Sequence, residues 1–460
     1  MSHRTSVVAA FFVCALLALM CSVSTASASS VIRGVDDLGL GGKTAKADAS
    51  RISFLATKLH AGLVRVDVRW ANVEPRRGVY DQAYLTELQN RIQLAAGDGL
   101  QVIVTLYGTP AWASDHSLWG YAPPSYAKGV YHSFYPPAAN RLPDFQAFAT
   151  KLASTFVGDV TGYECRNEPN LWSSIYPQRT ATDAAFGVRR YAAMLTVFSA
   201  GIHAGDPHAL VIAGATGPTG LDNALSTDPI RFAKLLRGLV SSSVFDAYSH
   251  HPYAVGGTSR VAPEDMPEYP RRQVNLANIG ALLKIFPGKP FYLTEYGYYT
   301  QYSLSFGIWV SEPTQASYLI RAYRFAARFP QIKALVWFPY HDSSGANELF
   351  GAYSGLVTMA GAYKPSWFAF SGDNTLALTA AHKGGGSFRL AGKLTTSLGG
   401  LAGKSLTVSR RLPGGKWRVV KTVKTGTGGA YHLWVKVTGR AWFRLAWPGV
   451  VHSNTVEADA

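Results

Sequence analysis

Cysteine is scarce in this sequence, and apolar runs long enough to cross a membrane are absent. The chain has 3 cysteines in 460 residues, and Cys14 and Cys21 lie in an N-terminal segment that we expect to be removed. The mature chain then keeps only Cys165, which excludes an internal disulfide. A chain of this length can instead be stabilised by a large apolar core. We expect Cys165 to belong to that core, because a free cysteine far in sequence from any histidine usually behaves as a small apolar residue.

The first 28 residues have the pattern of a secretory signal peptide. Arg4 precedes an apolar run over residues 7–19, and small residues follow and end with Ala26-Ser27-Ala28. The run is too short for a membrane span. We therefore predict that residues 1–28 are cleaved and that the mature protein is secreted, with no integral membrane segment.

Acidic residues are nearly absent from the C-terminal part of the chain. Residues 376–460 contain 13 Lys and Arg against 2 acids, whereas residues 29–375 contain 30 against 26. The net charge of +16 therefore belongs mostly to the tail, which points to two domains with different partners. We predict a domain at 29–370, a linker at 371–375 and a basic domain at 376–460.

The basic domain has two interpretations. Its charge suits attachment to an anionic polymer of the cell envelope, or its lysines serve only to keep a spacer soluble. We expect no nucleic-acid partner.

Apolar stretches with strand character alternate with stretches of helical spacing up to residue 370. The predicted strands are 31–38, 63–70, 100–106, 161–168, 209–215, 245–253, 291–294 and 332–338. The predicted helices are 43–60, 84–96, 142–156, 183–204, 230–239, 273–286, 314–329 and 364–370. Eight such pairs predict an α/β fold, a (β/α)₈ TIM barrel. An open doubly wound sheet is the alternative, but residues 39–42 lack the glycine spacing of a dinucleotide-binding turn.

The sequence pattern changes after residue 375. Short alternating runs at 405–409, 417–423, 430–437 and 441–447 are separated by glycine-rich turns. This pattern is typical of an all-β module, and we predict a small sandwich domain.

Two glutamates end predicted strands that are far apart in the chain. Glu168 ends the fourth predicted strand, which stops at Pro169 because proline cannot donate to a sheet, and Glu295 ends the seventh strand 127 residues later. A barrel gathers the C-terminal ends of its strands on one face. Both carboxylates should therefore project over the same mouth.

Other strand ends at this mouth are polar or aromatic. Arg65, Asp67 and Arg69 alternate on one face of the second strand. Buried charges are costly unless paired, so Arg65 should meet a carboxylate. Two long loops, at 107–141 and 296–313, are rich in aromatic rings, including Trp112 and Tyr296. We expect some of these rings to flank the cleft and others to form a local core.

These motifs together resemble clan A of the retaining glycoside hydrolases. The resemblance is carried by Asn167-Glu168-Pro169 and by Thr294-Glu295-Tyr296-Gly297. It extends over about residues 31–370 and includes three further segments, namely Val64-Arg65-Val66, His251-Pro252-Tyr253 and Trp337. Family 39 is the most similar family and family 5 the next.

The resemblance implies roles for these residues. Glu168 would be the acid/base and Glu295 the nucleophile, acting on a polysaccharide or oligosaccharide without a cofactor or metal. Asn167 would bind the sugar 2-hydroxyl, and Arg65 and Tyr253 would hold the nucleophile. Trp337 would form the floor of the first sugar subsite. His251 would contact the sugar or a neighbouring side chain. Trp112 and Tyr296 are candidate sugar contacts.

Two rival functions and one geometric difficulty remain open. A metal-dependent hydrolase would need paired histidines on an early strand, and residues 31–37 have none. A non-catalytic carbohydrate-binding barrel attached to the envelope would be expected to lack one of the two glutamates. Strict alternation also sends Asn167 and Glu168 to opposite faces, so the chain must distort there.

Overall fold

The computed structural model of the protein describes residues 31–42, 48–121, 131–255, 261–302, 308–343 and 353–460. The predicted signal peptide lies outside these residues. None of the helices described is both long and apolar enough to cross a membrane.

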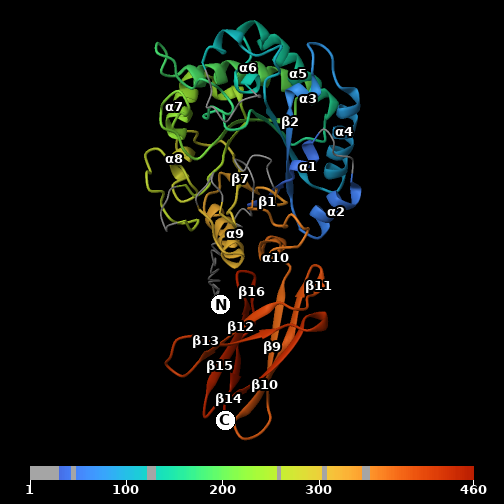
Figure 1. Cartoon of the computed structure of the whole chain (residues 1–460), viewed down its shortest axis with the longest axis vertical. Coiled ribbons are helices and arrows are strands. Elements are labelled where there is room, and N and C mark those ends of the chain that lie inside the picture. The colour runs from blue at the N-terminus through green and yellow to red at the C-terminus, as the bar shows by residue number, and fades with distance from the viewer. Residues whose placement is uncertain (1–30, 43–47, 122–130, 256–260, 303–307, 344–352) are drawn as a thin grey trace, which may run out of the picture.

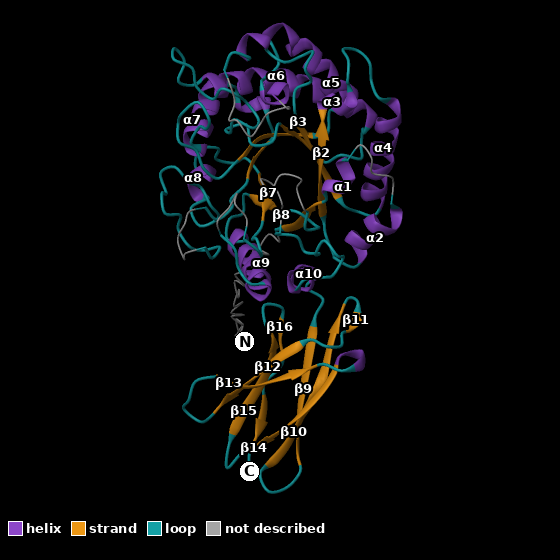
Figure 2. Cartoon of the chain, viewed as in Figure 1, coloured by secondary structure: helices purple, strands orange, loops and turns teal. Residues whose placement is uncertain are grey.

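Eight parallel strands close into a barrel in chain order, with each strand paired to the next and β8 paired to β1. The strands are β1 (Ile32–Asp36), β2 (Leu63–Arg69), β3 (Gln101–Tyr107), β4 (Gly162–Cys165), β5 (Leu210–Thr216), β6 (Ala247–His250), β7 (Phe291–Tyr296) and β8 (Ile332–Trp337). Figure 2 shows this ring of strands enclosed by helices. The predicted (β/α)₈ barrel is confirmed.

Helices of very different length surround the barrel (Figure 1). They are α1 (Leu38–Gly41), α2 (Ala49–Thr57), α3 (Trp70–Val73), α4 (Gln82–Gly97), α5 (Leu142–Thr155), α6 (Phe186–Gly205), α7 (Pro229–Leu239), α8 (Gly280–Leu283), α9 (Glu312–Ala326) and α10 (Pro365–Ser371). Several begin at a capping side chain; Asp81, Asp228 and Ser311 accept hydrogen bonds from backbone N–H groups of the first turn.

The predicted helix over 273–286 is wrong for most of its length, because only Gly280–Leu283 is helical. Asn275 and Asn278 compete for the backbone before it. The Asn278 Oδ1 accepts from the Asn275 N–H at 2.9 Å, and the Asn275 Oδ1 accepts from the Ala277 N–H at 3.0 Å. Such local side-chain bonds offer the backbone an alternative to a helix.

The interior of the barrel changes character along its axis. Near the start of the strands it is filled by apolar side chains, including Leu63, Ile103 and Ile212. At the next inward-facing positions toward the C-terminal ends of the strands, β2 and β4 place the buried charged residues Arg65 and Glu164 in the interior. The apolar layer closes the bottom of the barrel, so the polar layer faces the mouth at the C-terminal ends of the strands.

Two antiparallel sheets form the C-terminal domain, as the sandwich prediction requires. In one sheet β10 (Ser387–Thr396) pairs with β9 (Thr375–His382), β11 (Gly399–Gly400) and β14 (Ala430–Lys436). The other contains β12 (Ser405–Arg411), β13 (Arg418–Lys424), β15 (Ala441–Trp447), β16 (Val451–His452) and β17 (Val456–Ala458). β9 and β10 lie outside the strands predicted from the sequence.

The C-terminal domain lies beside α9 and α10 of the barrel (Figure 1). Residues 372–374 connect α10 to β9. The ring of Phe368 on α10 packs on Trp447 of β15, with centroids 5.0 Å apart. The ammonium group of Lys404 lies 5.6 and 5.5 Å from the centroids of these two rings. Aromatic packing therefore joins the two domains directly.

Candidate functional site

A distorted backbone directs Glu168 into the mouth of the barrel. β4 ends at Cys165, and Arg166 and Glu168 then adopt positive φ angles of 74° and 44°. The left-handed region is uncommon for residues other than glycine, and its occurrence is often linked to function. The Glu168 N–H donates to the carbonyl of Ala215 at 2.9 Å, which anchors the distorted segment to β5. A distortion at this point was expected because Asn167 and Glu168 are adjacent, but its form could not be read from the sequence.

The loop after β5 leaves room for the Glu168 carboxyl group only because residue 217 is glycine. A Cβ atom at Gly217 would lie 2.9 Å from the Glu168 Oε1. Asn170 holds this loop in place, since its Oδ1 accepts from the Gly217 N–H at 2.8 Å and its Nδ2 donates to the Thr227 carbonyl at 3.1 Å. Sequence reasoning passed over Asn170, although it follows Pro169 directly.

Glu295, at the end of β7, is held by side chains from two other strand ends. Its Oε1 accepts from the Nη1 of Arg65 at 2.7 Å, and its Oε2 accepts from the Tyr253 hydroxyl at 3.0 Å. Only 8 % of the residue is exposed. A cationic and a neutral donor thus fix the orientation of this carboxyl group.

His251 links the two glutamates. Its Nδ1 lies 3.1 Å from the Glu168 Oε1 and 3.6 Å from the Glu295 Oε2. These three ligand atoms lie within 4.8 Å of one another, so the carboxyl groups lie side by side. Burial disfavours the imidazolium, yet Glu295 and Glu168 together raise the pKa of His251 above its usual value.

Arg65 is the central charge of the site, and it is fully buried. Besides Glu295 it donates to the Glu164 Oε2 from Nε at 2.9 Å, to the Asp36 Oδ2 from Nη1 at 3.0 Å and to the Asn167 Oδ1 from Nη2 at 2.7 Å. Burial works against the charged guanidinium, but the surrounding carboxylates hold the pKa of Arg65 well above its ordinary value. The prediction that Arg65 pairs with a carboxylate is confirmed.

Glu164 is a functional residue that the sequence analysis missed. Its carboxyl group is fully buried and accepts from Thr105 Oγ1 at 2.6 Å, from Thr294 Oγ1 at 2.7 Å and from Arg65. Burial alone would raise the pKa of Glu164, but Arg65, the nearby His251 and hydrogen bonds from Thr105 and Ser249 lower it overall. Glu164 is therefore an ionised partner that positions Arg65. The alternation of Tyr163, Glu164 and Cys165 was the available signal for an inward acid.

Asp36 and Asp67 complete the acidic surroundings of Arg65. Burial raises the pKa of both residues, and for Asp36 the neighbouring Asp67 adds to the increase. Arg65 lies 3.4 Å from the Asp67 Oδ1. Burial favours the neutral form of these two carboxyl groups, whereas the neighbouring Arg65 cation favours their ionised form.

The predicted sugar-binding aromatic rings lie deeper than expected. Trp337 is fully buried and donates its indole N–H to the Ser354 carbonyl at 2.7 Å, and Tyr296 is 1 % exposed between Trp337 and Tyr253. Neither ring has an open face for a sugar in this structure. Trp112 is half-buried and packs edge-on against Trp70.

Other aromatic rings of the two long loops are more accessible. Among the described residues of these loops, Trp119, Tyr302 and Trp309 are 46 %, 63 % and 58 % exposed. Residues 122–130 and 303–307 of the same loops lie outside the described residues. The exposed rings are better placed than Tyr296 or Trp337 to meet an extended ligand.

The neighbouring residues His250 and His251 lie in different environments. His250 lies on the opposite side, with Nδ1 2.8 Å from Thr216 Oγ1 and Nε2 2.9 Å from the Val274 carbonyl. Burial lowers the pKa of His250 to about 3, so it is neutral. Glu168, His251 and Glu295 have a spacing that a metal ion could also use, but the adjacent Arg65 cation disfavours a second positive charge there.

Comparison with known proteins identifies the family. The family model of Cellulase (glycosyl hydrolase family 5) matches residues 40–320, more than half of the chain. The chain belongs to glycosyl hydrolase family 5. The resemblance to clan A is thereby confirmed, with the matching model from the family that the motifs ranked second. This family 5 protein is a glycoside hydrolase, and a carbohydrate is its substrate.

Solved structures share the fold of this family 5 protein at low identity. A family 39 glycoside hydrolase from Bacteroides cellulosilyticus WH2 matches with a TM-score of 0.54 and 17 % identity, over 91 % of this chain and 81 % of that one. Endo-glycoceramidase II from Rhodococcus sp. matches with a TM-score of 0.51 and 18 % identity, over 89 % and 97 %. GH5_18-E153A from Streptomyces cattleya matches with 0.51 and 15 %, over 74 % and 79 %. No curated protein matches this family 5 sequence.

Proposed function

We propose that this glycosidase is a secreted enzyme that hydrolyses O-glycosidic bonds with retention of anomeric configuration. The observation that carries the proposal is the short distance between the two acids, whose ligand oxygens lie within 4.8 Å of each other. Retaining enzymes place the two carboxyl groups about 5–5.5 Å apart, whereas inverting enzymes need about 6.5–9.5 Å to admit a water. The spacing in this barrel supports double displacement.

The surroundings of the two acids divide the roles between them. Glu295 is fixed by Arg65 and Tyr253 and is almost fully buried, which suits a nucleophile that must attack from one direction. The Glu168 side chain is 20 % exposed and contacts His251, which suits a group that exchanges protons with the leaving group and with water.

In the first step, Glu168 donates its proton to the glycosidic oxygen while a Glu295 oxygen attacks the anomeric carbon. The bond to the leaving oxygen breaks and a glycosyl ester forms. Glu168, now a carboxylate, takes a proton from water, and the water oxygen attacks the anomeric carbon and displaces Glu295. Asn167 accepts from Arg65 through its Oδ1, which leaves its Nδ2 as a donor for the sugar 2-hydroxyl.

The stereochemistry of the product tests this mechanism. We expect the sugar first released from an aryl glycoside or an oligosaccharide to keep the anomeric configuration of the substrate, as followed by proton NMR before mutarotation. A first product of the opposite configuration would mean a single displacement by water. That result would remove Glu295 from its role as nucleophile.

We further propose that the C-terminal domain attaches the enzyme to an anionic polymer of the cell envelope. Both of its acids, Glu457 and Asp459, pair with Arg440. Among the described residues, none of the other 12 basic side chains of this domain has an ion pair, and β13 is exposed along most of its length. Unpaired cations on an exposed sheet favour an anionic partner.

Salt dependence of retention tests this attachment. We expect the full-length protein to be retained on isolated cell envelopes at about 0.05 M salt and released at about 1 M, where charges are screened beyond about 3 Å. Lys421→Glu with Lys424→Glu on β13 should release the protein at lower salt. Retention that is equal at both salt concentrations would show that charge does not hold the domain there.

A further inference from the structure

A large cavity lies at the junction of the two domains, away from the barrel mouth. Its volume is about 610 Å³, and its walls come from β1, α9, the end of α10 and the β15–β16 turn. Arg33 stands near the start of β1, at the opposite end of that strand from Asp36, which contacts Arg65 in the site. The cavity is therefore separate from the two catalytic candidates.

The cavity is lined by basic side chains and by no acid. Arg33, Arg321, Arg324 and His452 contribute to its wall, and no aspartate or glutamate does so. Arg321 is neutralised by Glu264, with its Nε 3.1 Å from the Glu264 Oε1. Among the residues that the structure describes, no carboxylate lies within ion-pair distance of Arg33 or Arg324.

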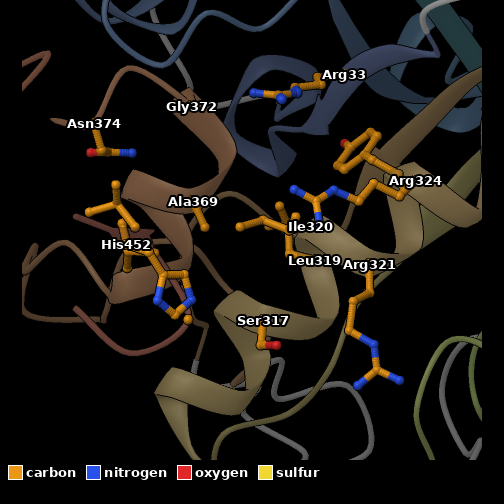
Figure 3. A pocket seen from close by; sticks show the side chains of 14 residues that line it. Arg33, Ser317, Leu319, Ile320, Arg321, Arg324, Ala369, Gly372, Asn374 and His452 are labelled. Carbon is orange, nitrogen blue, oxygen red and sulfur yellow. The ribbon is translucent and has the colours of Figure 1, made fainter. Parts of the chain in front are cut away.

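The guanidinium groups of Arg33 and Arg324, which lack a carboxylate partner among the described residues, face the cavity. In Figure 3, Arg33 and Arg324 extend toward the same space from β1 and α9, whereas Arg321 points away from it. Arg33 is held in place because it donates to the Phe370 carbonyl and lies 5.7 Å from the centroid of the Tyr323 ring. Its position at the wall is thus set by protein contacts, and Arg324 adds a second charge from an exposed position.

The walls of the cavity are fixed relative to each other. A Cβ atom at Gly449 would lie only 2.2 Å from the Pro313 carbonyl oxygen, so the β15–β16 turn sits directly against the start of α9. The packing of Phe368 on Trp447 closes the same junction. Apolar side chains, Ile320 and Val450 among them, also contribute to the lining.

We propose that this cavity is a second, non-catalytic saccharide-binding site for sugars that carry a carboxylate, such as uronic acids. A guanidinium fork matches a carboxylate and can bind it through two parallel hydrogen bonds. The volume falls within the range of about 300–1,000 Å³ typical of small-molecule sites, and the apolar lining suits the faces of sugar rings. A site of this kind holds an acidic polymer at the domain junction while the barrel mouth hydrolyses a glycosidic bond.

Charge reversal at Arg324 in the full-length protein tests the proposal. Binding of trigalacturonate and of a neutral cello-oligosaccharide of equal length is measured by calorimetry at low salt. We expect wild type to bind trigalacturonate more tightly than the neutral oligosaccharide, and Arg324→Glu to weaken trigalacturonate binding by about tenfold or more, because it replaces an attraction with a repulsion. Hydrolysis of a small aryl glycoside should stay unchanged, which separates this site from the catalytic proposal.

Arg328→Glu is the matched control, since Arg328 is also exposed, lies four residues further along the chain and packs over Phe325 outside the cavity. It changes the net charge equally and should leave trigalacturonate binding within about twofold of wild type. Equal losses of trigalacturonate binding in the two variants would show that only the overall charge matters, and would contradict a binding site in this cavity. Equal binding of the acidic and the neutral oligosaccharide by wild type would overturn its preference for carboxylates.

Discussion

Replacing Glu295 with alanine is expected to lower kcat by about 10⁴-fold or more, the order of loss seen when the nucleophile of an enzyme is removed. The corresponding loss of transition-state stabilisation is about 5.5 kcal/mol. The neighbouring Glu164 cannot replace it as the nucleophile, because it is fully buried and accepts hydrogen bonds from Arg65, Thr105 and Thr294. The measurement is steady-state hydrolysis of an aryl glycoside.

Rescue by a small anion identifies the role of Glu295 more sharply than the loss alone. The truncated side chain leaves space beside the anomeric carbon, so azide should restore part of the activity of Glu295→Ala. The glycosyl azide formed should have the inverted configuration, because azide attacks once from the face that Glu295 occupied. Glu312→Ala, at the first turn of α9, is the control for a surface acid and should keep wild-type rates. Activity of Glu295→Ala within tenfold of wild type would contradict the assignment.

Glu168→Gln is expected to change the enzyme in a way that depends on the leaving group. Glutamine keeps the size of the side chain and an oxygen that can accept from His251, but it cannot donate the catalytic proton. For substrates with poor leaving groups, kcat/KM should fall by about 10²–10⁴-fold, the usual contribution of general acid catalysis. For a dinitrophenyl glycoside, which needs no protonation to leave, kcat/KM should change little.

The second step still needs a base, so the same variant should release a burst of dinitrophenol and then turn over slowly. Glu268→Gln replaces an exposed glutamate that lies outside the catalytic site and should show neither effect. Thermal unfolding of each variant checks that folding is intact. Equal losses of kcat/KM for good and poor leaving groups would show that Glu168 does not act as the general acid.

The order of strands and helices was largely predictable because each barrel strand is a short apolar run between helical repeats. Glu295 lies at the end of β7 as predicted, whereas β4 ends at Cys165, before the predicted strand end at Glu168. The sandwich architecture of the C-terminal domain was predicted, although β9 and β10 were not predicted as strands. The helix over 273–286 failed because Asn275 and Asn278 bond locally to the backbone.

The details of the site were less predictable, since they depend on contacts between distant segments. Arg65 was expected to meet a carboxylate, but its Glu164 partner came from the inward face of β4 and was overlooked. Trp337 and Tyr296 were expected to face a sugar, whereas packing among the loops buries both rings. Aromatic residues near a mouth look alike in sequence whether they line a cleft or its supporting core.

Local pattern alone was enough to establish a barrel with two strand-end glutamates and a basic β-domain, because side-chain periodicity and composition are properties of neighbouring residues. The approach of the two glutamates, the shared contact with His251 and the cavity between the domains arose only on folding. Each depends on packing between segments that are distant in the sequence, and the approach of the two glutamates also depends on the positive φ angles of Arg166 and Glu168. Such contacts leave no periodic trace in the chain, so only the tertiary structure decides them.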